Sequence, residues 1–186
     1  MSYLFTLVLS DRTRMLNATA TNPRTVSTNF KMVIRQYKPT DRQACIEIFK
    51  NNCPDYFDPT EIDGLENWLN GQDKGEIIYK TSVADFFYVL ENDKQIIACG
   101  GFYIVKDKLN ANMVWGMVDK RYHRQGFGRE LFQYRVAQIQ KLFPKHSIVL
   151  DTSQHTYNFF TRLGFSVTKI TQDAYGHGLD RYDMTK

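Results

Sequence analysis

The stretch RYHRQGFGRELF, residues 121–132, joins an apolar run that predicts a strand to an amphipathic pattern that predicts a helix. Its glycines, Gly126 and Gly128, stand at the expected helix start. Backbone N–H groups at a helix start lack intrahelical partners and carry partial positive charge. Glycine lets an anion approach them without a Cβ in the way. The stretch therefore favours a phosphate-binding turn, although the glycines alone would equally fit a tight turn with a solvated basic rim.

Arginine side chains around the turn could add charge-assisted hydrogen bonds to the same anion; they are Arg121, Arg124 and Arg129. The absence of two known nucleotide-binding motifs narrows the class of ligand that this turn could bind. The sequence has no G-x-x-x-x-G-K-[ST], which argues against a P-loop. The turn also lacks the third glycine of the dinucleotide-binding spacing and follows several strands instead of opening a β-α-β unit. A ligand that contains a pyrophosphate group therefore stays possible, but the sequence shows no obvious NAD or ATP site.

The hydrophobic pattern on both sides of the turn predicts a mixed α/β sheet of about six to seven strands with helices on both faces. The expected strands are residues 33–37, the two runs of a hairpin at 86–105, and residues 111–119, 146–151, 164–170 and 180–184. The expected helices are residues 39–52, 58–72, the one that follows Gly126, and 156–163. The third of these helices shows one apolar stripe, made of Leu131, Phe132, Val136, Ile139 and Leu142.

Turn and cap residues set the expected boundaries. Thr40 is expected to cap the first helix, Pro59 to stand near the start of the second and Gly71 near its end. The hairpin is expected to turn around residues 92–93. Gly164 is expected to close the last helix.

Length and composition indicate one domain with a proper core, since the chain has 186 residues of which 42% are hydrophobic. The net charge of +4 bears on solubility and does not by itself indicate a nucleic-acid partner. The three cysteines, Cys45, Cys53 and Cys99, show no C-x-x-C pair and no zinc spacing. We therefore expect buried thiols, no metal site and a reducing, cytoplasmic environment.

Residues 1–31 differ in composition from the rest and are expected to form a mobile arm, or an extension ahead of a natural start near Met32. Pairing of residues 4–9 as an extra edge strand is the alternative. The apolar run at residues 3–9 is too short for a membrane span, and no basic residues precede it as in a secretory signal. The expected domain is thus residues 32–186.

Two longer stretches resemble a known family. VDKRYHRQGFGRELF, residues 118–132, is similar to the acetyl-CoA signature of the GNAT superfamily of N-acetyltransferases, and LDTSQHTYNFFTRLGF, residues 150–165, resembles its second cofactor motif. Their order and separation match the family, as does the order of elements over residues 32–184. The resemblance implies an enzyme that uses acetyl-CoA as cosubstrate and moves an acetyl group to a primary amine by direct transfer.

The resemblance also implies a set of cofactor-binding residues. Backbone amides of the turn would hold the CoA pyrophosphate, strand-edge groups would pair with the pantetheine arm, and the start of the last helix would line the thioester. The residues concerned are Met117, Val118, His123, Arg124, Gln125, Gly126, Phe127, Gly128, Arg129, Ser153, Thr156 and Phe160. Thr156 and Phe160 are expected on one helix face, with Ser153 one turn earlier.

The sequence departs from the family at two positions. His123 stands where Arg or Gln is usual and is interpreted as a turn residue. Phe160 replaces the tyrosine that gives a proton to the CoA thiolate, and phenylalanine has none to give. Either the thiolate leaves unassisted or Tyr157 serves, although packing of Tyr157 on the sheet is an equal alternative. No general base stands out; Asp119 and Asp151 are candidates that could instead cap turns.

The acceptor side would come from the first two helices and the loop between the last strands, with Tyr56, Phe57, Asp58, Glu61, Trp68, Tyr175 and His177. These suit a small cationic amine or a peptide amine, although Phe57 and Trp68 could equally lie in the core or at a homodimer contact. A main-chain N–H near Val118 would stabilise the oxyanion. The alternative function is a CoA-binding sensor without chemistry. Nucleic-acid binding is disfavoured because the basic cluster is local.

Overall fold

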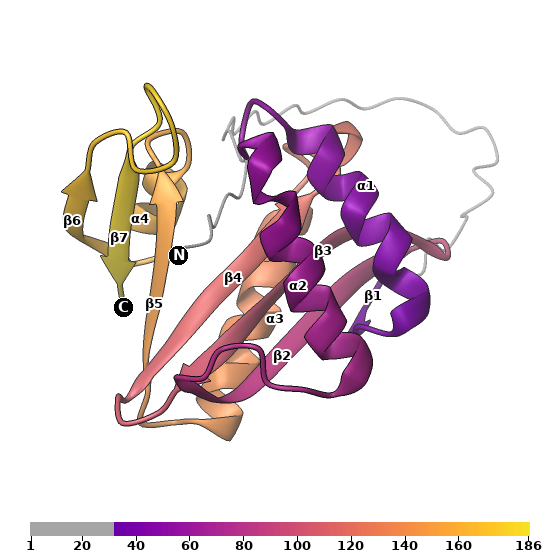
Figure 1. Ribbon diagram of the computed structural model, residues 1–186, viewed down its shortest axis with the longest axis horizontal. Coiled ribbons are helices and arrows are strands. Elements are labelled where there is room, and N and C mark those ends of the chain that lie inside the picture. Colours follow the sequence, from indigo (N-terminus) through magenta and orange to yellow (C-terminus); the bar gives the residue numbers. More distant parts are fainter. Residues whose placement is uncertain (1–31) are drawn as a thin grey trace, which may run out of the picture.

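Seven strands form one mixed sheet in the computed structural model, in the spatial order β1-β2-β3-β4-β5-β7-β6 (Figure 1). Their bounds are β1 Met32–Gln36, β2 Ser82–Asn92, β3 Gln95–Val105, β4 Asn110–Val118, β5 Ser147–Ser153, β6 Ser166–Thr171 and β7 Arg181–Thr185. The structure describes residues 32–186, so the expectations for residues 1–31 lie outside the described residues. Only the β4–β5 pair is parallel in this part of the chain. The expected mixed sheet is confirmed.

Helices cover both faces of the sheet. α1 Arg42–Asn52 and α2 Ile62–Lys74 lie on one face, and α3 Phe127–Leu142 lies on the other (Figure 1). The short helix α4 Tyr157–Arg162 lies beside the outer strands β5, β7 and β6. Both the order of the elements and their types agree with the pattern expected from the sequence.

The expected cap of the first helix was wrong, and the second helix continues slightly past the glycine expected near its end. Thr40 does not cap α1, because a 3-10 turn at Pro39–Asp41 precedes the helix and the Asp41 carboxylate accepts the Lys38 N–H at 2.9 Å. Pro59 does open the turn before α2, but the helix runs past Gly71 and ends at Gly75, whose φ is +68°. Gly71 is needed inside the helix, since a Cβ there would lie 2.2 Å from Ile78 Cδ1.

The β2–β3 hairpin turns one residue later than expected. Asp93 and Lys94 both have positive φ, +47° and +66°, as a two-residue hairpin turn of the mirror-image type requires. The glycine expected after α4 is confirmed, because Gly164 has a φ of +88° and follows the C-cap residue Leu163.

The core has one layer on each face of the sheet. The layer under α3 contains Leu131, Phe132 and Ile139 of the predicted stripe, whereas Leu142 is exposed. The layer under α1 and α2 contains Phe57 and Trp68, both fully buried, so these two residues belong to the core. Cys45 and Cys99 are also fully buried there, and Cys53 is half-buried; none forms a disulfide.

A β-bulge interrupts β4. Trp115 and Gly116 stand opposite the single residue Gly100 of β3, and Trp115 has a φ of +49°. The fully buried Arg135 of α3 lies against this bulge, and its Nη1 donates to the carbonyl oxygens of Gly101 at 3.1 Å and Val114 at 3.4 Å. Burial lowers the pKa of Arg135 to about 9, so the guanidinium is charged at neutral pH. A buried cation thus binds one carbonyl of each strand at the pair that adjoins the bulge.

Two absences in residues 32–186 concern membrane-spanning helices and clusters of metal-binding side chains. No helix there is long and apolar enough to cross a membrane. No group of three or more His, Cys, Asp or Glu side chains there is placed to hold a metal ion.

Candidate active site

The strands β4 and β5 pair over three residues and then separate (Figure 1). Their register joins Asn110 to Ser147 and ends at the pair Asn112–Val149. Beyond this point no strand of residues 32–186 pairs with the edge of β4 that faces β5. Met117 and Val118 lie at the far end of this segment and pair on their other edge with Cys99 and Ala98 of β3. The separated strands form a groove whose wall carries main-chain groups, which can pair with an extended ligand.

The turn that follows β4 presents a run of main-chain amides. A 3-10 turn at Lys120–Tyr122 is capped by Asp119, and α3 begins after Gly126, whose φ is +93°. The first helical bonds run from Arg129 and Glu130 to the Gly126 carbonyl oxygen. Within the described residues, no hydrogen bond engages the N–H groups of residues 124–128. Apart from its chain neighbours, no residue of the described range has an atom within 4 Å of where a Cβ of Gly126 would stand, so an anion can reach these amides.

The arginines around this turn differ in what they contact. Arg121 binds its own cap residue, since Nε and Nη2 donate to the Asp119 carboxylate at 3.0 and 2.7 Å. Arg124 has a φ of +63°, and both Arg124 and Arg129 are exposed, with no ion pair to any residue of the described range. Of the three predicted phosphate contacts, Arg124 and Arg129 are therefore the two that a ligand would meet without competition.

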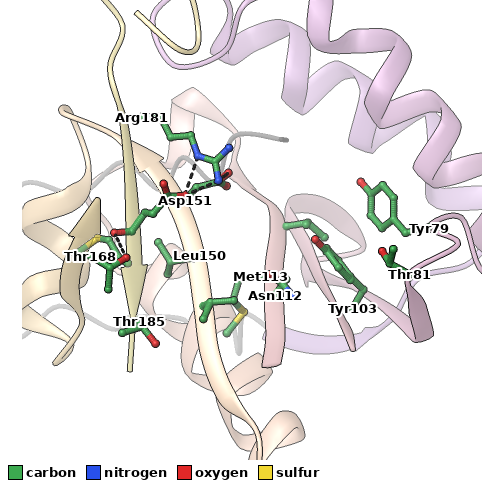
Figure 2. Close-up of a pocket in the computed structure, with 14 residues that line it drawn as sticks. Tyr79, Thr81, Tyr103, Asn112, Met113, Leu150, Asp151, Thr168, Arg181 and Thr185 are labelled. Atoms are coloured by element: carbon green, nitrogen blue, oxygen red, sulfur yellow. Dashed lines mark hydrogen bonds and ion pairs between the residues drawn. The ribbon is translucent and has the colours of Figure 1, made fainter. Parts of the chain in front are cut away.

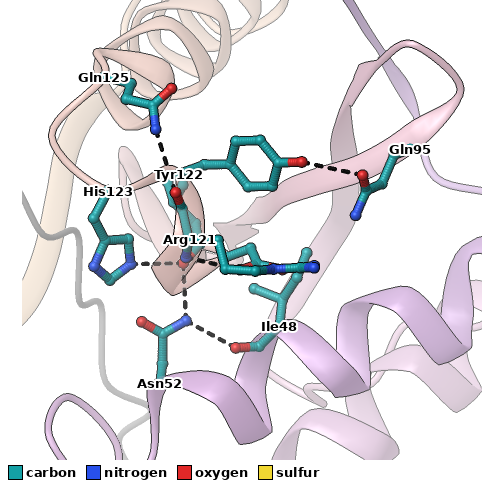
Figure 3. A network of polar contacts seen from close by, with 9 residues as sticks. Ile48, Asn52, Gln95, Arg121, Tyr122, His123 and Gln125 are labelled. Atoms are coloured by element: carbon teal, nitrogen blue, oxygen red, sulfur yellow. Dashed lines mark hydrogen bonds and ion pairs between the residues drawn. The ribbon is translucent and has the colours of Figure 1, made fainter.

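His123 closes the end of β4. Its Nε2 lies 2.8 Å from the Val118 carbonyl oxygen, which also accepts the Asn52 side-chain amide at 2.9 Å (Figure 3). A carbonyl oxygen only accepts, so Nε2 carries the hydrogen. The ring packs edge-on against Tyr56 at 5.6 Å, and burial lowers the pKa of His123. The carbonyl of Val118 is thus occupied by two donors, which supports a structural role for His123 in the turn.

The region of the second predicted motif has a different local geometry from the one expected. Ser153 is the last residue of β5 and Thr156 precedes the first turn of α4, so they do not share a helix face with Phe160. The Thr156 hydroxyl bonds that of Thr152, and all of these residues are buried. Phe160 packs among the rings of Phe132, Phe159 and Phe165.

Tyr157, the candidate proton donor, stacks on Tyr182 of β7 with ring centroids 4.6 Å apart. Its neighbour His155 is exposed. The ring of Tyr157 therefore lies against the outer strand, in the packed position that was the alternative to catalysis.

A polar cavity of about 470 Å³ lies on the α1–α2 side of the sheet where β4 and β5 separate (Figure 2). Asp151 of β5 and Asp183 of β7 line one wall, with Arg181 between them, and Tyr79 and Tyr103 line the opposite wall. Asn112 of β4 lies between the two walls. The sequence pointed to Asp151 but missed the other residues, because they come from four separate strands or loops.

The residues expected on the acceptor side do not lie together in the structure. Asp58, Tyr175 and His177 line a smaller hollow of about 280 Å³ between the α1–α2 loop and the β6–β7 loop. Asp58 and Glu61 also cap the turn before α2. Tyr56 contacts His123, and Phe57 and Trp68 belong to the core, as described above.

The split sheet and the amide-rich turn are those of the GNAT acetyltransferase fold. A crystal structure of a Desulfovibrio desulfuricans protein described as a GNAT-family acetyltransferase superposes with a TM-score of 0.68 at 17% identity, over 84% of this chain and 98% of that one. The ribosomal-protein-S18-alanine N-acetyltransferase of Escherichia coli gives 0.65 at 19% identity, over 83% and 92%. An aminoglycoside 6′-N-acetyltransferase complexed with coenzyme A gives 0.63 at 12% identity, over 83% and 96%.

The sequence agrees with this fold. Residues 84–167 match the family model described as an acetyltransferase (GNAT) domain. Residues 84–167 are thus similar in sequence to a GNAT acetyltransferase domain, and the fold of the described residues is the one these structures share. No curated protein sequence matches the chain significantly.

A first prediction concerns the amides of the turn. Because Asn and Asp both tolerate positive φ, Gly126→Asp and Gly126→Asn differ mainly in charge. The aspartate should weaken CoA binding at least about tenfold relative to the asparagine, since a carboxylate would face the pyrophosphate. Calorimetric titration with CoA measures the difference, and equal affinities of the two variants would contradict the site.

A second prediction concerns His123. Because burial lowers its pKa below 6.5, the unfolded chain takes up a proton as pH falls through 6.5 while the folded protein does not. Stability should therefore fall between pH 7 and pH 5. The variant His123→Gln keeps a donor for the Val118 carbonyl and should lose less of its free energy of unfolding over this pH range. Urea unfolding at both pH values tests this, and equal losses in both proteins would refute it.

Proposed function

We propose that this protein transfers the acetyl group of acetyl-CoA directly to a primary amine. The observation that carries the proposal is the run of unengaged amides at residues 124–128 beside the separated edge of β4. The amides suit a pyrophosphate, and the strand edge suits the amide-containing pantetheine arm. Arg124 and Arg129 would add charge-assisted contacts. The residues present thus fit CoA as the carrier of the acyl group.

The proposed reaction relies on positioning. Met117 and Val118 would lie along the pantetheine, and Ser153, Thr156 and Phe160 would border the sulfur end of the groove. Holding the amine against the thioester supplies much of the rate, and a main-chain N–H near Val118 would stabilise negative charge on the thioester oxygen. The Val118 carbonyl oxygen, already bound by Asn52 and His123, would hold this end of β4 in place.

A thiol assay tests the transfer. The protein is mixed with acetyl-CoA and a panel of small amines, peptides and polyamines, and free thiol is followed over time. We expect release above the hydrolysis background with at least one amine, together with formation of the acetylated amine by mass spectrometry. Tight CoA binding without release for any amine would favour the alternative function, a CoA-binding sensor that lacks chemistry. The absence of phenol at Phe160 is the observation that favours this alternative.

The fate of the CoA thiolate gives a further prediction. A thiol has a pKa near 8.5, so its anion leaves without much help at neutral pH. Tyr157→Phe keeps the ring that stacks on Tyr182 and removes only the hydroxyl. We expect kcat to change less than about threefold. A loss of more than about tenfold, the scale of general acid catalysis, would instead make Tyr157 the proton donor.

A further inference from the structure

The cavity between β4 and β5 has an excess of negative charge. Asp151 and Asp183 face each other across the β5–β7 pair, where two like charges would repel. Arg181 relieves this repulsion, because its Nη2 contacts both carboxylates and its Nε donates to Asp183 at 2.8 Å. Two carboxylates and one guanidinium leave one net negative charge on this wall.

Asp151 is the carboxylate nearer to the acyl-transfer groove. β5 is the strand that separates from β4, whereas β7 lies one strand further out. Asp151 is largely buried and lines the cavity at its β5 wall (Figure 2). Arg181 Nη2 contacts its Oδ2 at 3.1 Å, while Asp183 receives both Nε and Nη2 of the same guanidinium. A cation that enters the cavity therefore meets Asp151 beside the edge of β4.

A polar group without a partner also points to a ligand here. The side-chain nitrogen of Asn112 is buried and has no hydrogen-bond partner among the described residues, although the residue lines the cavity. A buried donor left unpaired is destabilising, so a ligand that carries a hydrogen-bond acceptor would satisfy the Asn112 side-chain nitrogen.

Other titratable groups surround Asp151 on the neighbouring elements. Arg181 and Asp183 of β7, Tyr103 of β3 and Tyr79 before β2 line the cavity, whereas Tyr175 of the β6–β7 loop lines the neighbouring hollow. Burial raises the pKa of Asp85 of β2, but its carboxylate already accepts the Ile78 N–H and the Ser82 hydroxyl. Burial, aided by the charges of Asp151 and Asp85, raises the pKa of Tyr103 to about 12, and burial also raises that of Tyr175. Both phenols stay neutral at physiological pH, and Asp183 is held by two donors.

We propose that this cavity binds the acceptor as a primary ammonium ion that carries a neutral hydrogen-bond acceptor nearby, as in an amino acid amide or a peptide N-terminus, and that Asp151 removes its proton. The inference rests on the proposed acetyl transfer. Asn112 binds the neighbouring carbonyl oxygen of the acceptor molecule. Arg181 and Asp183 are positioning residues, which hold the Asp151 carboxylate. A free amino acid is disfavoured because its own carboxylate would meet the negative wall.

The proton balance is complete. Asp151 takes one proton from the ammonium group, and the neutral nitrogen attacks the thioester carbonyl carbon. As the carbon–nitrogen bond forms, the carbon–sulfur bond breaks and its electron pair leaves with sulfur. The second proton of the nitrogen passes to the departing thiolate, and Asp151 returns its proton to water. An ammonium ion and acetyl-CoA thus yield an acetamide, CoA thiol and one proton.

Kinetics of two aspartate variants separate the roles. Asp151→Asn should lower kcat/KM for alaninamide about 100-fold or more at pH 7, the scale of a general base, with activity rising towards high pH as the amine loses its proton unaided. Asp183→Asn should lower it less and keep the wild-type pH profile. The remote turn variant Asp93→Asn is the control and should match the wild type. An unchanged pH profile in Asp151→Asn would overturn the proposal, as would equal losses in both cavity variants.

Binding without acetyl-CoA gives an independent readout. NMR titration of the full chain should show alaninamide binding at least about tenfold more tightly than alanine at pH 7, and Asp151→Asn should abolish that preference. Thermal unfolding and CoA affinity should stay the same in all variants, which confirms folding. If no amine releases thiol but alaninamide still binds through Asp151, the transfer is wrong and the site stands. If thiol is released while alaninamide and alanine bind equally, the acceptor assignment fails alone.

Discussion

The geometry of the site depends on how briefly β4 and β5 are paired. A parallel pair that continued past Asn112 and Val149 would use the main-chain groups of both strands and close the groove. Because pairing stops there, one edge of β4 keeps its hydrogen-bonding groups for another partner, while its other edge stays bound to β3. The cavity beside Asp151 and the amide-rich turn after Val118 both border this separation.

The bulge in β4 and the cation behind it make this separation compatible with a packed core. Two residues opposite one increase the local twist of a strand and turn it away from its neighbour. Arg135 binds one carbonyl of β3 and one of β4 next to the bulge, and Gly100 leaves room for it, since a Cβ there would lie 2.7 Å from Nη1. The fold thus places a charged side chain in an otherwise apolar layer at the point where the sheet divides.

The order and type of the elements could be predicted because they depend on local signals. Hydrophobic periods, turn residues and the glycines around the 121–132 stretch act over a few neighbours. Boundaries depended on packing, as Gly71 shows: it looks like a helix end but makes room for Ile78 inside α2. The amide turn is contiguous and was predictable as well.

The cavity was not predictable for a related reason. Asp151 and Asp183 are 32 positions apart in the sequence and meet only through the β5–β7 register. Arg135 was equally hidden, since an arginine beside an apolar stripe normally points to solvent. The family resemblance predicted the residues expected to bind CoA, whereas the residues of the cavity could be found only from the arrangement of the strands in space.

The position of the indole rings decides what optical spectroscopy can observe in this protein. Trp68 and Trp115 are the two tryptophans of the chain, and both are fully enclosed in the layer under α1 and α2. Trp115 is itself a bulge residue and packs near the rings of Phe49 and Phe57. Emission will therefore respond to small shifts of β4 when a ligand enters the groove, while fraying of β6 and β7, which carry no indole, will pass undetected.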